Sequence, residues 1–205
     1  MTTRLPARDS SYTPTMSSER VGVLGGTFDP VHIGHLAVAV AVRHALGLDR
    51  VLLVVAGDPW QKRGSVVASA DDRLAMTRAA VAGLEGIEAS GLEVDRPGPT
   101  YTVDTLRELS DAQRELFLIV GVDVAAGLDT WHRVDEVRAA ATLVVVSRAG
   151  ESRRDAGIPV HVRVPRLDVS SSDLRHRIAT DEPIDVLVPP EVVRVIRERR
   201  LYTRT

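Results

Sequence analysis

Short runs of valine and leucine alternate along this chain with longer stretches of helical periodicity, and this alternation limits the possible folds most strongly. The strand-like runs cover residues 21–24, 51–55, 87–94, 116–120, 143–146 and 160–164. The helical stretches between them cover residues 34–46, 70–82, 103–109 and 134–141. Nearly continuous apolar strands are typical of sheets covered on both faces, and strand–helix alternation is typical of parallel βαβ units. We therefore expect an α/β fold with a doubly wound parallel sheet.

Beyond residue 164 the pattern becomes helical, over residues 171–179 and 190–199. We expect a single domain over residues 20–205, with a Rossmann-like core over 20–164 and a small helical C-terminal section over 165–205. Residues 1–19 are rich in Ser, Thr and Pro and are expected to be a disordered tail, with Met16 as an alternative start. In doubly wound sheets, ligands bind beyond the carboxyl ends of the strands.

The composition excludes several classes of protein. The chain has no cysteine, which excludes disulfides, thiolate metal sites and thiol nucleophiles. Its single lysine, Lys62, follows Gln61, so neither a Walker A loop nor the lysine motif of protein kinases is present. The net charge of −2 gives no footprint of bulk nucleic-acid binding, and the arginines between 194 and 200 lie among glutamates, as on a solvated helix face.

No apolar run reaches the roughly 18 residues that a membrane-spanning helix needs, and the N-terminal residues lack the apolar core of a secretory signal. We therefore expect no membrane partner and a cytoplasmic protein.

The most informative segment, residues 25–35, reads Gly-Gly-Thr-Phe-Asp-Pro-Val-His-Ile-Gly-His and lies between the first expected strand and helix. Gly25 and Gly26 let the backbone approach a bulky anion, and the free N–H groups of a helix start favour phosphate oxygens. His32 and His35 are three residues apart, so both imidazoles point the same way and can stabilise developing negative charge. The glycine spacing, G-x-x-G-G, is not the dinucleotide-binding fingerprint.

Two other interpretations apply to this segment. It could be a purely structural turn with two satisfied histidines, or a His-x-x-His metal pair. A metal pair lacks cysteine and a third ligand at a typical spacing, so we expect no metal held by the protein. The combination of all eleven residues at one strand–helix junction favours phosphate binding over a structural turn.

A second candidate segment, Ser170-Ser171-Ser172, opens the helix expected at 171–179. Serines cap the free N–H groups of a helix start, and N–H groups left uncapped can bind phosphate. Arg175 in the first turn opposes the helix dipole unless an anion lies there. The alternative is an ordinary serine-capped surface helix. Gly121 and Asp123, after the strand expected at 116–120, lie where this fold binds a ribose, although so short a pattern is a weak signal.

Residues 25–35 resemble the nucleotidyltransferase superfamily, whose hallmark is His-x-Gly-His after a Gly-x-Phe-Asp-Pro turn, and residues 169–175 resemble its second signature. The same stretch also spells the HIGH tetrapeptide of class I aminoacyl-tRNA synthetases. That class also needs a lysine-rich loop, and the corresponding later motif here has no lysine. A chain of 205 residues also leaves no room for the additional modules of that class.

Residues 98–106, Gly-Pro-Thr-Tyr-Thr-Val-Asp-Thr-Leu, resemble a segment of the nicotinate-mononucleotide adenylyltransferases. Residues 129–132 are similar to the segment in which that family carries a tryptophan against the pyridine ring, and the resemblance extends from about residue 20 to residue 202. Two positions depart from the family pattern. Val134 replaces a second aromatic, and Ser172 replaces threonine.

This resemblance implies that ATP and nicotinic acid mononucleotide give deamido-NAD and pyrophosphate by direct in-line attack. It implies catalytic roles for His32, His35 and Arg175, and Mg²⁺ carried by the substrate. The implied ATP-binding residues are Gly25, Gly26, Thr27, Phe28, His32, His35, Gly121, Asp123, Ser171, Ser172 and Arg175. The implied mononucleotide-binding residues are Thr27, Phe28, Lys62, Thr102, Trp131 and Arg148.

Other functions remain open from the sequence. The acceptor could be nicotinamide mononucleotide or phosphopantetheine, or the chain could be a non-catalytic nucleotide sensor. A homo-oligomer is also possible.

Overall fold

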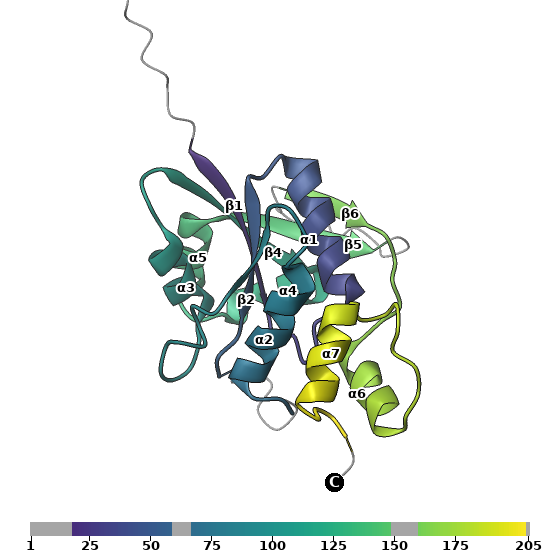
Figure 1. Ribbon diagram of the computed structural model, residues 1–205. Helices are drawn as coiled ribbons and strands as arrows, with labels where there is room; N and C mark the ends of the chain where they lie inside the picture. The colour runs from purple at the N-terminus through teal and green to yellow at the C-terminus, as the bar shows by residue number, and fades with distance from the viewer. Residues whose placement is uncertain (1–17, 59–66, 149–159, 204–205) are drawn as a thin grey trace, which may run out of the picture.

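A computed structural model describes residues 18–58, 67–148 and 160–203, which contain a six-stranded sheet of order β3-β2-β1-β4-β5-β6 (Figure 1). The strands are β1 (Glu19–Gly26), β2 (Arg50–Val55), β3 (Ile87–Ser90), β4 (Arg114–Gly121), β5 (Thr142–Arg148) and β6 (Val160–Val164). Every neighbouring pair is parallel. The expected doubly wound parallel sheet is confirmed, and its order reverses between β1 and β4, where such sheets bind ligands.

Helices cover both faces of the sheet (Figure 1). The longer ones are α1 (Ile33–Leu46), α2 (Ala70–Val81), α3 (Thr102–Leu109), α5 (Val134–Ala140), α6 (Ser171–Ala179) and α7 (Pro190–Glu198). Side chains of α1, α2, α6 and α7 share one apolar core with the sheet, and those of α3 and α5 share a second core on the opposite face.

The two cores explain why the strands are apolar at successive positions. In β2, Leu53 belongs to the core under α1 and α2, whereas its neighbours Leu52 and Val54 belong to the core under α3 and α5. Successive side chains of a strand point to opposite faces, so a strand between two helical layers buries all of them.

Two local predictions differ from the structure. The strand expected over residues 87–94 ends at Ser90, because β3 is an edge strand that pairs only with Val51–Val54 of β2. The chain then turns, and the N–H of Asp95 donates to the carbonyl of Gly91 at 2.9 Å. The short helix α4 (Val122–Ala126) and a 3-10 turn (Leu128–Thr130) were not expected, because both are too short to show periodicity.

The C-terminal section packs back onto the core. Helix α7 lies against α2, where Arg199 forms a 2.7 Å ion pair with Asp72, and the following Tyr202 is buried. In the part of the chain that the structure describes, no helix is long and apolar enough to cross a membrane.

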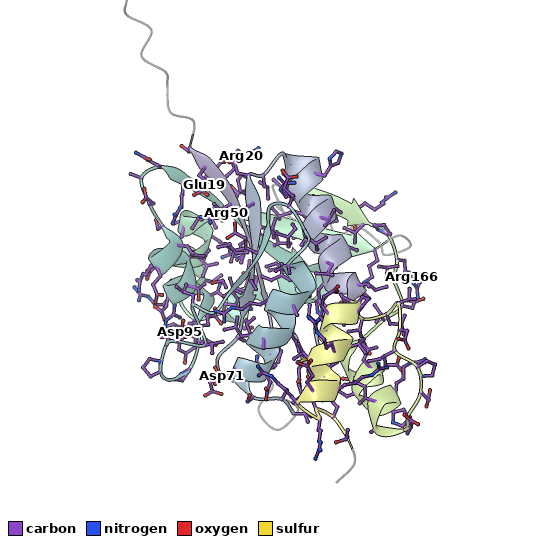
Figure 2. All side chains as sticks on the ribbon, in the orientation of Figure 1. Glu19, Arg20, Arg50, Asp71, Asp95 and Arg166 are labelled. Atoms are coloured by element: carbon purple, nitrogen blue, oxygen red, sulfur yellow. The ribbon has the colours of Figure 1, made fainter. Side chains whose placement is uncertain are left out.

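Ion pairs gather at the amino end of the sheet, where Figure 2 labels Glu19, Arg20 and Arg50. Glu19 accepts from Arg50 at 2.9 Å and from Arg114 at 2.9 Å, so charges from three neighbouring strands neutralise one another there. The segment of residues 25–35 follows the opposite, carboxyl end of β1, and the serine segment before α6 follows the carboxyl end of β6.

Candidate active site

The loop after β1 turns tightly over its own glycine. A Cβ added to Gly26 would lie 2.7 Å from the ring of Phe28, so only glycine fits there. Phe28 is buried with φ of 51°, in the left-handed region that a bulky residue rarely adopts. Its ring therefore fills the core under the loop, and its contribution toward a ligand is limited to the backbone.

His32 and His35 cap the start of α1 reciprocally. The Nδ1 atom of His32 accepts from the N–H of Gly34 at 3.2 Å, and the Nδ1 atom of His35 accepts from the N–H of His32 at 3.2 Å. The two rings stack with centroids 3.8 Å apart, and Phe28 meets His35 edge-on at 4.9 Å. With Nδ1 accepting, the geometry assigns the ring proton of each neutral imidazole to Nε2, which makes both rings hydrogen-bond donors.

Burial holds His32 in its neutral form. Desolvation, with a smaller contribution from the positive charge of Arg148, lowers the pKa of His32 to about 4. The first turn of α1 has no acidic residue, so its positive helix end is not neutralised there. This helix start therefore offers neutral N–H donors and a positive electrostatic potential, which suit a phosphate.

The start of α6 lies directly on this loop. The hydroxyl of Ser171 donates to the carbonyl of Pro30 at 2.9 Å, and the Nη1 atom of Arg175 donates to the carbonyl of Asp29 at 2.7 Å. The Nη2 atom of Arg175 also bonds the hydroxyl of Ser172 at 3.3 Å. The structure therefore brings the histidine and serine segments together, although some 140 residues separate them. Arg175 is the fifth residue of α6, so it lies just beyond the first turn in which it was expected, and Asp29 and Ser172 hold its guanidinium at the loop.

Asp29 anchors the loop from below, a role that sequence reasoning missed. Its buried carboxylate accepts from the N–H groups of Val67 at 2.9 Å and Ala68 at 3.1 Å, and from the hydroxyl of Tyr202 at 2.7 Å. This arrangement satisfies a buried charge that would otherwise be costly. It ties the loop to the start of α2 and to the C-terminal section.

Arg73 is the second missed residue and is 1% exposed. Its guanidinium donates to the carbonyls of Thr27 at 2.9 Å, Ala56 at 2.7 Å and Gly57 at 3.1 Å. These carbonyls belong to the loops after β1 and β2, so one side chain fixes both loops at the carboxyl edge of the sheet. Of this network, only Asp29 belongs to a motif that the sequence singles out. Arg73 resembles a surface residue of a polar helix.

A pocket of about 280 Å³ opens beside this loop, on the face covered by α3. Gly25, Gly26 and Thr27 line it, together with the predicted residues Thr102 and Trp131. The rings of Tyr101 and His132, which also line the pocket, meet at 4.5 Å. Trp131 is therefore not the only ring at this pocket, even though Val134 replaces an aromatic.

The remaining predicted residues are placed as follows. Gly121 lines the pocket at the end of β4, and Asp123 is exposed in the first turn of α4. Arg148, assigned to the mononucleotide from the sequence, does not line this pocket but acts electrostatically on His32. Lys62 lies outside the described residues.

The described residues contain no group of three or more His, Asp or Glu side chains arranged to hold a metal ion. The carboxylate of Asp29, which lies in the loop before α1, already accepts three hydrogen bonds. A metal at this site would have to be held mainly by the ligand's own oxygens and water.

Comparison with known proteins agrees with this geometry. The model of the cytidylyltransferase-like family matches residues 23–177. A protein of Roseiflexus sp. (strain RS-1) named "Probable nicotinate-nucleotide adenylyltransferase" is 44% identical over 91% of this chain and 100% of its own length. A protein of the same name from Frankia casuarinae is 46% identical over 87% of this chain and 98% of its own length.

Among solved structures, the Plasmodium falciparum nicotinic acid mononucleotide adenylyltransferase in complex with NaAD matches with a TM-score of 0.72. The match covers 90% of this chain and 97% of that one at 17% sequence identity, which shows a shared fold.

Removing the hydroxyl that anchors Asp29 should destabilise the protein. Tyr202→Phe deletes one hydrogen bond to a buried carboxylate, and we expect it to lower the free energy of unfolding by about 1.5–3 kcal/mol in urea denaturation. Thr203→Ala, which removes a neighbouring exposed hydroxyl, should change it by less than about 0.5 kcal/mol. Equal stability of Tyr202→Phe and the parent would contradict the anchoring role.

His32 should stay neutral in the folded protein down to about pH 5, and NMR titration of its ring resonances should give a midpoint near 4. The unfolded chain binds this proton near pH 6.5, so stability should rise with pH between about 4 and 6.5. The variant His32→Gln identifies the resonances and should show a weaker pH dependence of stability. A folded-state midpoint above 6 would show that the ring is not desolvated.

Proposed function

The chain belongs to the cytidylyltransferase-like family and, within it, to the nicotinate-nucleotide adenylyltransferases, and on this premise we propose that it transfers the adenylyl group of ATP to nicotinic acid mononucleotide. The products are deamido-NAD and pyrophosphate. This is one of the steps that build a pyridine dinucleotide.

The observation that carries the proposal is the meeting of two helix starts beside one pocket. The first turn of α1 presents His32 and His35, and α6 contacts the same loop through Ser171 and Arg175. The pocket with Thr102 and Trp131 begins at Gly26 and Thr27, on the other side of that loop. A triphosphate over the helix starts and a mononucleotide in the pocket would therefore meet at Gly26 and Thr27.

The reaction needs positioning and charge stabilisation rather than a nucleophilic side chain. An oxygen of the mononucleotide 5′-phosphate forms a bond to the α-phosphorus of ATP, and the bond from that phosphorus to the bridging α–β oxygen breaks. Pyrophosphate leaves with the bonding electrons. The attacking phosphate is ionised at neutral pH, so no general base and no covalent intermediate is required.

His32 and His35 donate from Nε2 to phosphate oxygens, and His35 contacts the transition state. Arg175, with Ser171 and Ser172, adds positive charge and donors toward the departing pyrophosphate. Arg148 lies on this phosphate side. A neutral His32 costs no proton transfer during the reaction, so its donor geometry is in place before the substrate arrives.

The start of α3 supports an acidic acceptor. Among the described residues no side chain caps this helix, whose first turn carries Thr102 and borders the pocket. The first turn also holds Asp104, whose charge is paired with Arg107 at 3.5 Å. Uncapped N–H groups at a helix start favour a carboxylate over a neutral amide. Trp131 supplies an aromatic face for the pyridine ring.

Mg²⁺ would be held by the oxygens of ATP and by water, because the described residues contain no group of three or more His, Asp or Glu side chains that could hold it. It would neutralise charge on the phosphate oxygens. We propose that the protein acts in the cytoplasm and binds no nucleic acid.

Pyrophosphate release with different acceptors tests the function directly. With ATP and Mg²⁺, we expect release with nicotinic acid mononucleotide and a lower kcat/KM with nicotinamide mononucleotide, because only the acid can use the helix start. Phosphopantetheine should give no release. Faster turnover with the amide or with phosphopantetheine would assign another acceptor, and no release with any of the three would favour a sensor.

His35→Gln tests the transition-state contact. Gln retains a side-chain acceptor for the N–H of His32, as in an ordinary capping box, but lacks the imidazole donor. We expect kcat to fall by about 10²–10³, as for loss of one preorganised donor. His176→Gln, which changes an exposed histidine of α6, should keep the parental rate. A parental kcat in a folded His35→Gln enzyme would remove the assigned role.

A further inference from the structure

The pocket wall contains one carboxylate, Glu93, that the proposed chemistry does not use. It lies in the turn after β3, opposite the ends of β1 and β4. A negative charge beside a site for an anionic substrate repels that substrate, so a carboxylate at this position needs an explanation. The contacts of Glu93 supply a structural one.

Glu93 holds the helix start that carries Thr102. Its Oε1 atom accepts from the hydroxyl of Thr105, the fourth residue of α3, at 2.5 Å. Thr105 is 1% exposed, so this bond is shielded from water. The carboxylate therefore fixes the end of the first turn of α3, while the hydroxyl of Thr100, before the helix, donates to the carbonyl of Asp58 at 3.3 Å.

The charge of Glu93 is balanced on the side away from the pocket. The guanidinium of Arg96 acts on it and also forms a 2.6 Å ion pair with the exposed Glu108. Desolvation raises the pKa of Glu93, opposed mainly by the hydrogen bond from Thr105 and by the charge of Arg96. The carboxylate is thus withdrawn from water and directed at α3 rather than at the ligand.

The backbone of Glu93 is held by the same Arg73 network that holds the loop after β1. A Cβ on Gly57 would lie 2.1 Å from the carbonyl oxygen of Glu93, so the loop after β2 presses directly on it. The carbonyl of Gly57 in turn accepts from Arg73, which also holds Thr27. The position of the turn that carries Glu93 is therefore fixed relative to the loop after β1, over which the nucleotides would meet.

Resting on the proposed function, we propose that Glu93 is a positioning residue for the acceptor, holding the first turn of α3 where its N–H groups meet the nicotinate carboxylate. It sets the KM for the mononucleotide and the preference for the acid over the amide. It does not act on ATP or on the chemical step.

The test compares Glu93→Ala, Glu93→Gln and the control Glu108→Gln in the full-length enzyme. Glu108→Gln removes a charge beside the same Arg96 but lies outside the pocket. For each variant, KM and kcat are measured with ATP and with each of the two mononucleotides. Thermal unfolding is recorded alongside.

We expect Glu93→Ala to raise the KM for nicotinic acid mononucleotide by about ten- to a hundredfold, the size of one lost hydrogen bond to a charged group. The kcat and the KM for ATP should change less than about threefold, and the acid-to-amide ratio of kcat/KM should fall. Glu93→Gln should restore most of the affinity, because its amide oxygen still accepts from Thr105. Glu108→Gln should match the parent.

An unchanged KM for the acid in Glu93→Ala would overturn the inference. An equal rise in the KM for ATP, or an equal effect of Glu108→Gln, would also overturn it, because either result would indicate general damage or a mere charge effect. If Glu93→Ala does not fold, Thr105→Val decides by the same criteria, since it removes the hydroxyl at nearly constant volume. A parent enzyme inactive with nicotinic acid mononucleotide would instead refute the proposed function.

Discussion

The buried carboxylate of Asp29 is the interaction on which the site depends. This side chain accepts from the N–H groups of Val67 and Ala68 and from the hydroxyl of Tyr202, and the backbone carbonyl of Asp29 accepts from the guanidinium of Arg175. Three separate parts of the chain thus converge on one residue of the loop after β1. Because a buried carboxyl group is costly without hydrogen-bond partners, these donors hold the loop in one conformation.

The electrostatics of the site follow from this rigid loop. With the loop held, the starts of α1 and α6 lie together, and the positive end of α1, whose first turn has no acidic residue, adds to the charges of Arg148 and Arg175. His32 contributes a donor rather than net charge, because burial keeps it neutral. The site therefore attracts a polyanion through fixed positive charge and orients it through neutral N–H groups. That division suits a reaction in which charge moves between phosphates while no side chain changes its protonation.

Much of this arrangement follows from local sequence patterns. The parallel sheet follows from apolar strands such as β2, and the two helix starts that meet at the site follow from His32, His35 and the serines before α6. The parts that could not be predicted depend on long-range packing. Arg73 and Tyr202 carry no local signal, since their roles exist only once loops far apart in the chain meet at Asp29. Glu93 was expected in a strand over residues 87–94. Strand β3 instead ends at Ser90, where its pairing with β2 ends, and that pairing is a long-range contact.

The central claim is that one triphosphate touches both distant segments at once. Hydrogen–deuterium exchange with a non-hydrolysable ATP analogue and Mg²⁺ measures this directly, because bound phosphates protect the amides that they contact. We expect slower exchange in residues 25–35 and in residues 170–175, with the same half-saturating concentration of analogue for both. Protection of one segment alone, or protection of the two at clearly different concentrations, would contradict the claim.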